Sequence, residues 1–134
     1  MIMRLPDRNF ARDQSGATAV EFALVSSAFI ALVMGICYVG LMLFNNLSLE
    51  WAVASASRLA EINKSVTQTT IAQAVNDRLS SMALPNATVS YNSSVSGGLR
   101  TAVITASYDQ TYTLPLVSTF NIHFSSSITV PQPS

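Results

Sequence analysis

Apolar and polar positions divide the first half of the chain into two helical stretches. Residues 22–44 form a run of 23 residues without a charge, and a helix needs about 20 residues to cross the hydrocarbon core of a membrane. Residues 45–64 contain neither Pro nor Gly and show apolar residues at helical spacing with charges between them. We predict one helix over about residues 17–63, membrane-spanning over about 22–44 and amphipathic beyond. The predicted apolar face of that second half consists of Leu47, Trp51, Ala54, Leu59 and Ile62.

A second, shorter helix is predicted from Thr67 to Met82. Thr67 or Thr69 can cap its start, and Pro85 ends it. One face carries Ile71, Val75, Leu79 and Met82. We expect this face to pack on the amphipathic half of the first helix.

From Ala87 onward the period changes to two, which is typical of half-buried strands. Gly97-Gly98 marks a turn between the first two strands, and Leu114-Pro115 ends the second. The pattern predicts three antiparallel strands with one apolar face against the helices. The fold class is therefore α+β: a long N-terminal helix, a second short helix and a small three-stranded sheet. The apolar parity is carried by Ala87, Val89, Tyr91, Ala102, Ile104, Ala106, Tyr108, Tyr112, Phe120, Ile122, Phe124, Ile128 and Val130.

Composition and charge indicate a membrane protein rather than a soluble domain. Only 10% of residues are charged and 49% are hydrophobic, whereas soluble domains carry about 25% charged residues. Arg4, Arg8 and Arg12 precede the apolar run, so the positive-inside rule puts that end in the cytoplasm. We predict a basic leader over residues 1–16, the long helix over 17–64 and an extracytoplasmic α+β domain over 65–134. The net charge is zero, which does not favour nucleic acid as a partner.

The residue types that usually carry catalysis are scarce. His123 is the only histidine and falls on the polar parity of its strand; Cys37 is the only cysteine and lies in the apolar run. One of each cannot supply a zinc site, and no serine lies in a Gly-x-Ser-x-Gly setting. We therefore expect no catalytic residue, no metal, no cofactor and no enzyme activity. Four carboxylates are interpreted as solvated positions or ion-pair partners: Glu50, Glu61, Asp77 and Asp109.

The most informative stretch is Gly16 to Phe22, where one carboxylate, Glu21, stands at the edge of the apolar run. One interpretation is a signal-anchor helix in which Glu21 is incidental. A second is a signal peptide cleaved after its apolar core. The apolar core of a signal peptide has about 7–15 residues, and this run is longer. A third is cleavage before the run, between Gly16 and Ala17. The freed Ala17 amine would then lie one helical turn from Glu21.

This third pattern resembles the type IV pilin-like proteins that prepilin peptidase processes. The sequence from Gly16 through Glu21-Phe22 is similar to that of the tight-adherence (Flp/Tad) pilus system, and most similar to TadE-like pseudopilins. The Ala- and Arg-containing continuation over residues 52–60 and the β-rich tail fit that family in pattern. The major Flp pilin is similar at the cleavage site but much shorter, so length and Phe22 favour the minor, pseudopilin class. The chain departs from many relatives in lacking an acidic residue near Tyr38.

The resemblance implies that Gly16 precedes the scissile bond, that Ala17 is the mature N-terminus, and that Glu21 and Phe22 complete the processing and assembly motif. The implied function is a minor structural subunit for assembly or initiation of the pilus. The implied partners are prepilin peptidase, sibling pseudopilins, the major Flp pilin, the inner-membrane assembly platform and membrane lipid. The expected location is the bacterial inner membrane, single-pass, with a cytoplasmic N-terminus, a periplasmic C-terminal domain and incorporation into the extracellular pilus.

An alternative from another class remains open. The chain could be an uncleaved, single-pass membrane-anchored binding module whose sheet recognises an extracytoplasmic ligand. A third hypothesis is the anchored accessory subunit of an envelope enzyme. Cleavage at Gly16 discriminates the pilin-like interpretation from both.

Overall fold

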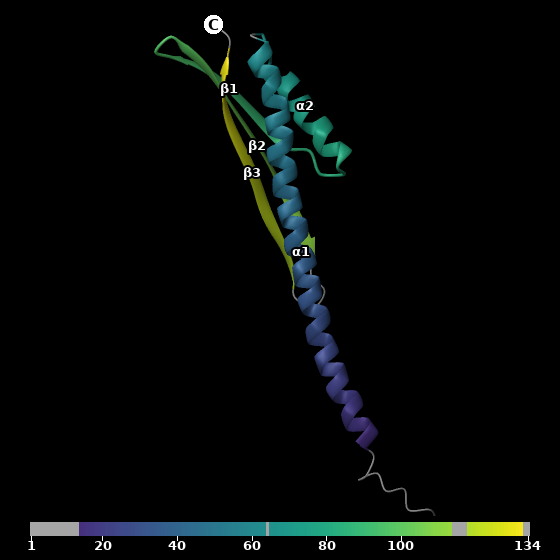
Figure 1. The fold of residues 1–134 in the computed structure, drawn as a ribbon. Coiled ribbons are helices and arrows are strands. Elements are labelled where there is room, and N and C mark those ends of the chain that lie inside the picture. Colours follow the sequence, from purple (N-terminus) through teal and green to yellow (C-terminus); the bar gives the residue numbers. More distant parts are fainter. Residues whose placement is uncertain (1–13, 64, 114–117, 133–134) are drawn as a thin grey trace, which may run out of the picture. The chain divides into compact units, whose positions relative to one another are not determined.

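The computed structural model describes residues 14–63, 65–113 and 118–132. In chain order the elements are α1 (Gln14–Ile62), α2 (Gln68–Ser81), β1 (Thr88–Ser96), β2 (Leu99–Thr113) and β3 (Thr119–Gln132) (Figure 1). Two helices followed by a three-stranded antiparallel sheet confirm the predicted α+β class. Most of the predicted leader and the Leu114-Pro115 break lie outside the described residues.

Helix α1 is 49 residues long. The chain divides into two compact units, and the division falls within α1, after Gly40. Within the first unit the large apolar side chains of α1 are exposed. By length and composition, α1 is the one helix among the described residues that could cross a membrane, and secretory signal sequences share those properties. The exposed side chains include Val20, Phe22, Leu24, Val25, Phe29, Ile30, Leu32, Ile36 and Val39.

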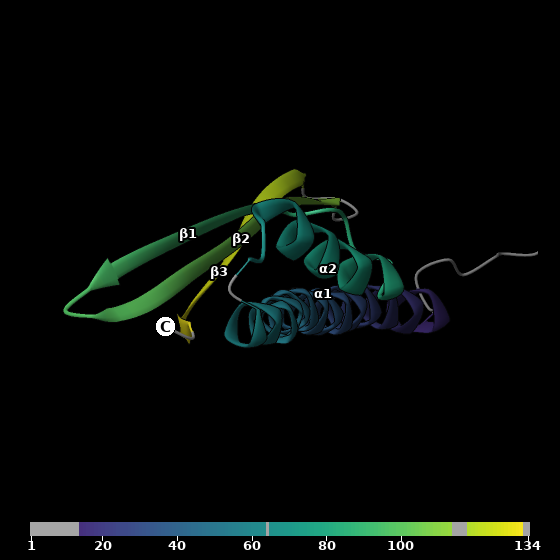
Figure 2. The same cartoon turned by 90° about the horizontal axis from the view of Figure 1, so that it is seen from above.

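In the second unit, α2 and the C-terminal half of α1 lie on the same side of the sheet (Figures 1 and 2). Thr67 caps α2, because its hydroxyl accepts a hydrogen bond from the Thr70 amide at 3.3 Å. Two polar contacts tie α2 to the first strand. The Gln68 side chain donates to the Val89 carbonyl at 3.0 Å, and the Ala87 amide donates to the Asn76 side chain at 2.8 Å.

The sheet has the order β1-β2-β3, with antiparallel neighbours throughout. Gly97 and Gly98 connect β1 to β2 with φ of 60° and 82°. Positive φ at both central residues is what a type I′ hairpin turn requires, and glycine adopts it without steric cost. The predicted parity is confirmed. The side chains buried on the inner face include Val89, Ala102, Ile104, Ala106, Tyr108, Tyr112, Phe124 and Val130.

The predicted apolar face of α1 beyond residue 45 is wrong. Leu47, Trp51 and Ile62 are 61%, 53% and 81% exposed. The buried face of α1 is made mostly of small side chains, which close-packed interiors accommodate as well as bulky ones. Its buried residues are Leu49, Ala52, Val53, Ala56 and Ala60. The predicted face of α2 is confirmed, with Ile71, Val75 and Leu79 buried.

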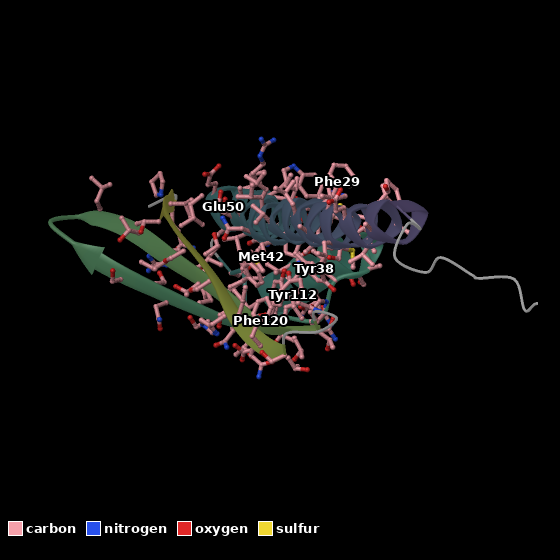
Figure 3. All side chains as sticks on the ribbon, turned by 90° about the horizontal axis from the view of Figure 1, so that it is seen from below. Phe29, Tyr38, Met42, Glu50, Tyr112 and Phe120 are labelled. Atoms are coloured by element: carbon pink, nitrogen blue, oxygen red, sulfur yellow. The ribbon has the colours of Figure 1, made fainter. Side chains whose placement is uncertain are left out.

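A polar clamp fixes α1 to β2 at the start of this packed region. Asn45 is 6% exposed; its amide donates to the Tyr112 hydroxyl at 2.6 Å, and its backbone carbonyl accepts from the Tyr108 hydroxyl at 3.3 Å. Each tyrosine also packs on a phenylalanine of β3. The ring centroids are 5.4 Å apart for Tyr108–Phe124 and 5.7 Å apart for Tyr112–Phe120, the pair labelled in Figure 3. Burial, followed by the neighbouring Tyr112, raises the pKa of the Tyr108 hydroxyl.

Candidate functional site

The structure places all four predicted site residues in the first turns of α1. The helix begins at Gln14, three residues before the predicted start. Gly16 and Ala17 therefore lie inside its first turn, and Glu21 and Phe22 follow about one turn after them. Ala17, Glu21 and Phe22 are exposed. No described part of the chain therefore blocks access of another molecule to the motif.

Gly16 is not required by the packing or the backbone of the chain. A Cβ at this position would meet no atom within 4 Å, and the residue does not have the positive φ that favours glycine. Glycine in a helix is destabilising by about 0.5–1 kcal/mol relative to alanine. Any requirement for a residue without a side chain here must come from a molecule that binds the segment.

The spacing of Ala17 and Glu21 is helical in the structure, as the sequence predicted. Four residues advance about 6 Å along a helix and return to nearly the same face. Neither side chain is covered by another part of the described chain. A new amine at Ala17 would therefore be within reach of the Glu21 carboxylate of the same or an adjacent chain.

Two further glycines in the apolar part of α1 repeat the observation made at Gly16. Cβ atoms at Gly35 and Gly40 would meet nothing within 4 Å. Small residues on a membrane helix let a second helix approach its backbone closely. These positions are thus available for helix packing that the isolated chain does not contain.

The sheet brings together one pair of chemically active side chains that the sequence kept apart. Asp109 lies opposite His123 in the register of β2 and β3, with Nδ1 and Oδ1 2.8 Å apart. Both side chains are well exposed, and their neighbours on this outer face are Ser, Thr and Asn side chains that pair across the strands. In water such a pair contributes little free energy, and no hydroxyl or thiol of the described chain is bonded to the ring as a nucleophile would be.

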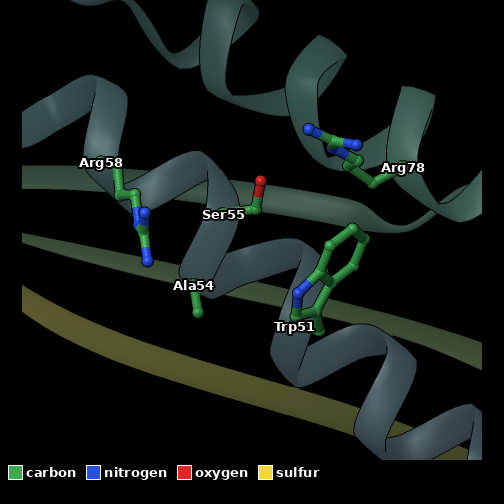
Figure 4. A pocket seen from close by; sticks show the side chains of 5 residues that line it. All are labelled: Trp51, Ala54, Ser55, Arg58 and Arg78. Carbon is green, nitrogen blue, oxygen red and sulfur yellow. The ribbon is translucent and has the colours of Figure 1, made fainter.

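Sequence reasoning missed a cluster on the other side of the domain, between α1 and α2. The Arg78 guanidinium lies 5.1 Å from the centre of the Trp51 ring, in the geometry of a cation–π contact. Figure 4 shows Arg78 reaching from α2 over Trp51, with Ser55 and Arg58 following along α1. These residues and Ala54 line an open hollow of about 440 Å³. The apolar pattern of α1 predicted Trp51 to be buried, so the sequence contained no signal for this cluster.

Comparison with known protein families gives a match that covers most of α1. A family model described as TadE-like protein matches residues 16–58. The match begins at Gly16 and contains the whole predicted motif, the apolar run and the first residues packed on the sheet. Comparison with curated proteins and with solved structures finds no match.

Proposed function

We propose that this chain, whose residues 16–58 match the family model described as TadE-like protein, is a minor, pilin-like structural subunit for assembly or initiation of a Flp/Tad-type pilus. The observation that carries the proposal is the extent of the family match, which starts at the residue predicted to precede the scissile bond. The exposed first turns of α1 and the uncovered apolar helix support it.

In the proposed mechanism the chain first inserts in the bacterial inner membrane with the three N-terminal arginines in the cytoplasm. Prepilin peptidase then hydrolyses the Gly16–Ala17 bond, leaving a carboxylate on Gly16 and an amine on Ala17. Because this bond lies in the first turn of α1, that turn must open to enter the enzyme. Helix ends fray readily, so the opening costs little.

Assembly follows through the apolar half of α1. Subunits pack laterally through their helices, and Glu21 sets their register by meeting an Ala17 amine. A charge at the centre of a membrane helix costs about 2.5–3.5 kcal/mol on insertion scales, and pairing with an amine removes much of that cost. Sibling pseudopilins, the major pilin and the assembly platform are the proposed partners.

The test is the intact mass and N-terminal sequence of the protein from the membrane fraction of a strain with active prepilin peptidase. A mature chain beginning at Ala17 is expected. If the peptidase requires a residue without a side chain before the scissile bond, Gly16→Leu should abolish cleavage, while Gly35→Leu should leave cleavage unchanged. Full-length protein in that strain would instead support the alternative of an uncleaved, membrane-anchored binding module.

A further inference from the structure

Beyond the apolar run, α1 has an outward face that the fold leaves uncovered. We use this name for the side of α1 that carries Leu47, Trp51 and Ala54, opposite the buried side of the helix. Leu47 and Trp51 are more than half exposed, although both lie in the unit that contains the sheet and α2. Large apolar side chains gathered on one side of a helix outside the membrane indicate a contact with another molecule.

One flank of the outward face is acidic. Glu50 and Glu61 are eleven residues apart, which places them within about 20° of each other around a helix. Glu50 lines the hollow between α1 and residues 125–128 of β3, so this flank lies toward β3. Glu50 accepts a hydrogen bond from the Asn46 side chain at 2.9 Å, and neither carboxylate forms an ion pair with a described residue.

Two basic side chains lie on the α2 side of this acidic flank, Arg58 on α1 and Arg78 on α2, and we call them the basic flank. Arg58 and Arg78 line the hollow that contains Trp51 and Ser55 (Figure 4). Asp77 lies beside Arg78 in an adjoining hollow, but neither arginine forms an ion pair within the part of the chain that the structure describes. Two guanidinium groups, an aromatic ring and a hydroxyl make a surface that favours a carboxylate next to apolar side chains.

We propose that the outward face binds a second copy of this chain, with the acidic flank of one copy against the basic flank of the other. The inference rests on the proposed function, because membrane insertion in one orientation makes neighbouring α1 helices parallel. Parallel helices that meet face to face or side by side bring opposite flanks together. The two carboxylates of one copy then face the two guanidiniums of the next, while Leu47 and Trp51 lose contact with water.

Charge reversal on full-length chains tests this contact. Two versions of the chain with different affinity tags are co-expressed in the native membrane, solubilised in mild detergent, and assayed for co-purification. The variant E50R/E61R has two basic flanks, and R58E/R78E has two acidic flanks. Either variant paired with itself should co-purify about tenfold less than the wild-type pair, since like charges meet.

Mixing the two variants should restore co-purification, because each basic flank then meets an acidic one. The fourfold variant E50R/E61R/R58E/R78E should also associate with itself. A folding defect cannot produce rescue by mixing, so the matched pair separates charge complementarity from loss of structure. Charge reversal on the outer sheet face, with D109K, is the control and should leave co-purification unchanged.

Loss in both variants without rescue by mixing would overturn the proposal, as would unchanged self-association. Rescue only in the presence of a different co-purifying subunit would replace the second copy by that partner and also contradict it. N-terminal sequencing of the same samples keeps the outcomes apart: cleavage after Gly16 without charge rescue leaves the proposed function standing and removes this contact alone.

Discussion

Asn45 shows how a single polar residue can fix a helix in an otherwise apolar sequence. It follows directly after the charge-free run and forms hydrogen bonds through both its side chain and its backbone to tyrosines of β2. A buried amide is costly unless it is bonded, and here both tyrosine hydroxyls are satisfied at the same position. The clamp therefore sets the rotation and height of α1 on the sheet more narrowly than apolar packing alone would.

Asn45→Ala should lower the free energy of unfolding of the domain by about 1–2 kcal/mol, because the amide donor to Tyr112 and buried packing are lost together. Thermal denaturation of the full chain in detergent micelles measures the change. Asn46→Ala is the matched control. Its side chain bonds Glu50 in an exposed position, so its loss should cost only a few tenths of that amount. Equal effects of the two variants would contradict a role for the clamp.

The stability of the domain should fall in alkali through Tyr108. Its pKa in the folded chain is raised above the ordinary value of about 10, so the folded state binds the proton more tightly than the unfolded state. The contribution is fully present below about pH 10 and is lost as the pH rises beyond it. Melting temperatures at pH 8 and pH 11 measure this loss. Tyr108→Phe should show a smaller decrease between the two; an unchanged decrease would contradict the assignment.

Residue-scale contacts such as the clamp were not predictable from the sequence. Asn45 is one of two adjacent asparagines, and nothing in the pattern says which is buried. Likewise, Asp109 and His123 are fourteen residues apart in a chain with few charges, and only the register of β2 and β3 makes them neighbours. Such pairs depend on strand register, which is fixed by the whole sheet and its turns rather than by local sequence.

At the scale of elements, the C-terminus of α2 carries local strain. The Leu84 amide bonds the Leu79 carbonyl and the Ala83 amide bonds the Ser80 carbonyl, both at 3.0 Å, which is the Schellman pattern. Ala83 has φ of 57°, a left-handed conformation that glycine usually supplies at this position. A residue with a Cβ pays about 1–2 kcal/mol there.

Ala83→Gly should therefore raise the free energy of unfolding by up to about 1 kcal/mol, the relief of strain exceeding the added flexibility of the unfolded chain. Urea or thermal unfolding of the detergent-solubilised chain tests the sign. Gly97→Ala at the hairpin is the opposite case, since it introduces a Cβ at φ of 60°, and should destabilise. A stabilising Gly97→Ala, or a destabilising Ala83→Gly, would show that the strain argument fails for this domain.

Elements whose pattern repeats locally were predicted well, and the packed face of α1 was not. The strands alternate strictly, and the α2 face carries bulky Ile71, Val75 and Leu79, so periodicity identified both. On α1 beyond residue 45, Leu47 and Trp51 lie on the outward face, whereas alanines such as Ala52 and Ala56 are buried. Hydrophobic size identifies a core only where bulky residues fill it. On α1 small side chains fill much of the buried face, so hydrophobic size did not identify it.

At the scale of the whole molecule, the proposed function separates processing from assembly. Glu21→Gln should leave cleavage after Gly16 largely intact and reduce pilus production at least about tenfold, because a neutral amide cannot form an ion pair with an ammonium. N-terminal sequencing and pilus yield from sheared cells give the two readouts. Asp109→Asn, a carboxylate on the outer face of the sheet, is the matched control and should have the smaller effect. Normal pilus production by Glu21→Gln would remove this residue from the mechanism.

The start of α1 at Gln14 has a consequence for the energetics of processing. Cleavage after Gly16 would remove the first turn and leave an ammonium group at the new helix N-terminus, where the partial positive charge of the helix dipole already resides. Each such unfavourable contact amounts to about 0.3–1 kcal/mol. The processed helix would thus carry two like charges at its tip, the ammonium group and the partial positive charge of the helix dipole. A carboxylate from the same helix or from an adjacent subunit would stabilise both. Proteolysis at this position would convert a neutral helix end into a binding determinant that did not exist before the cut.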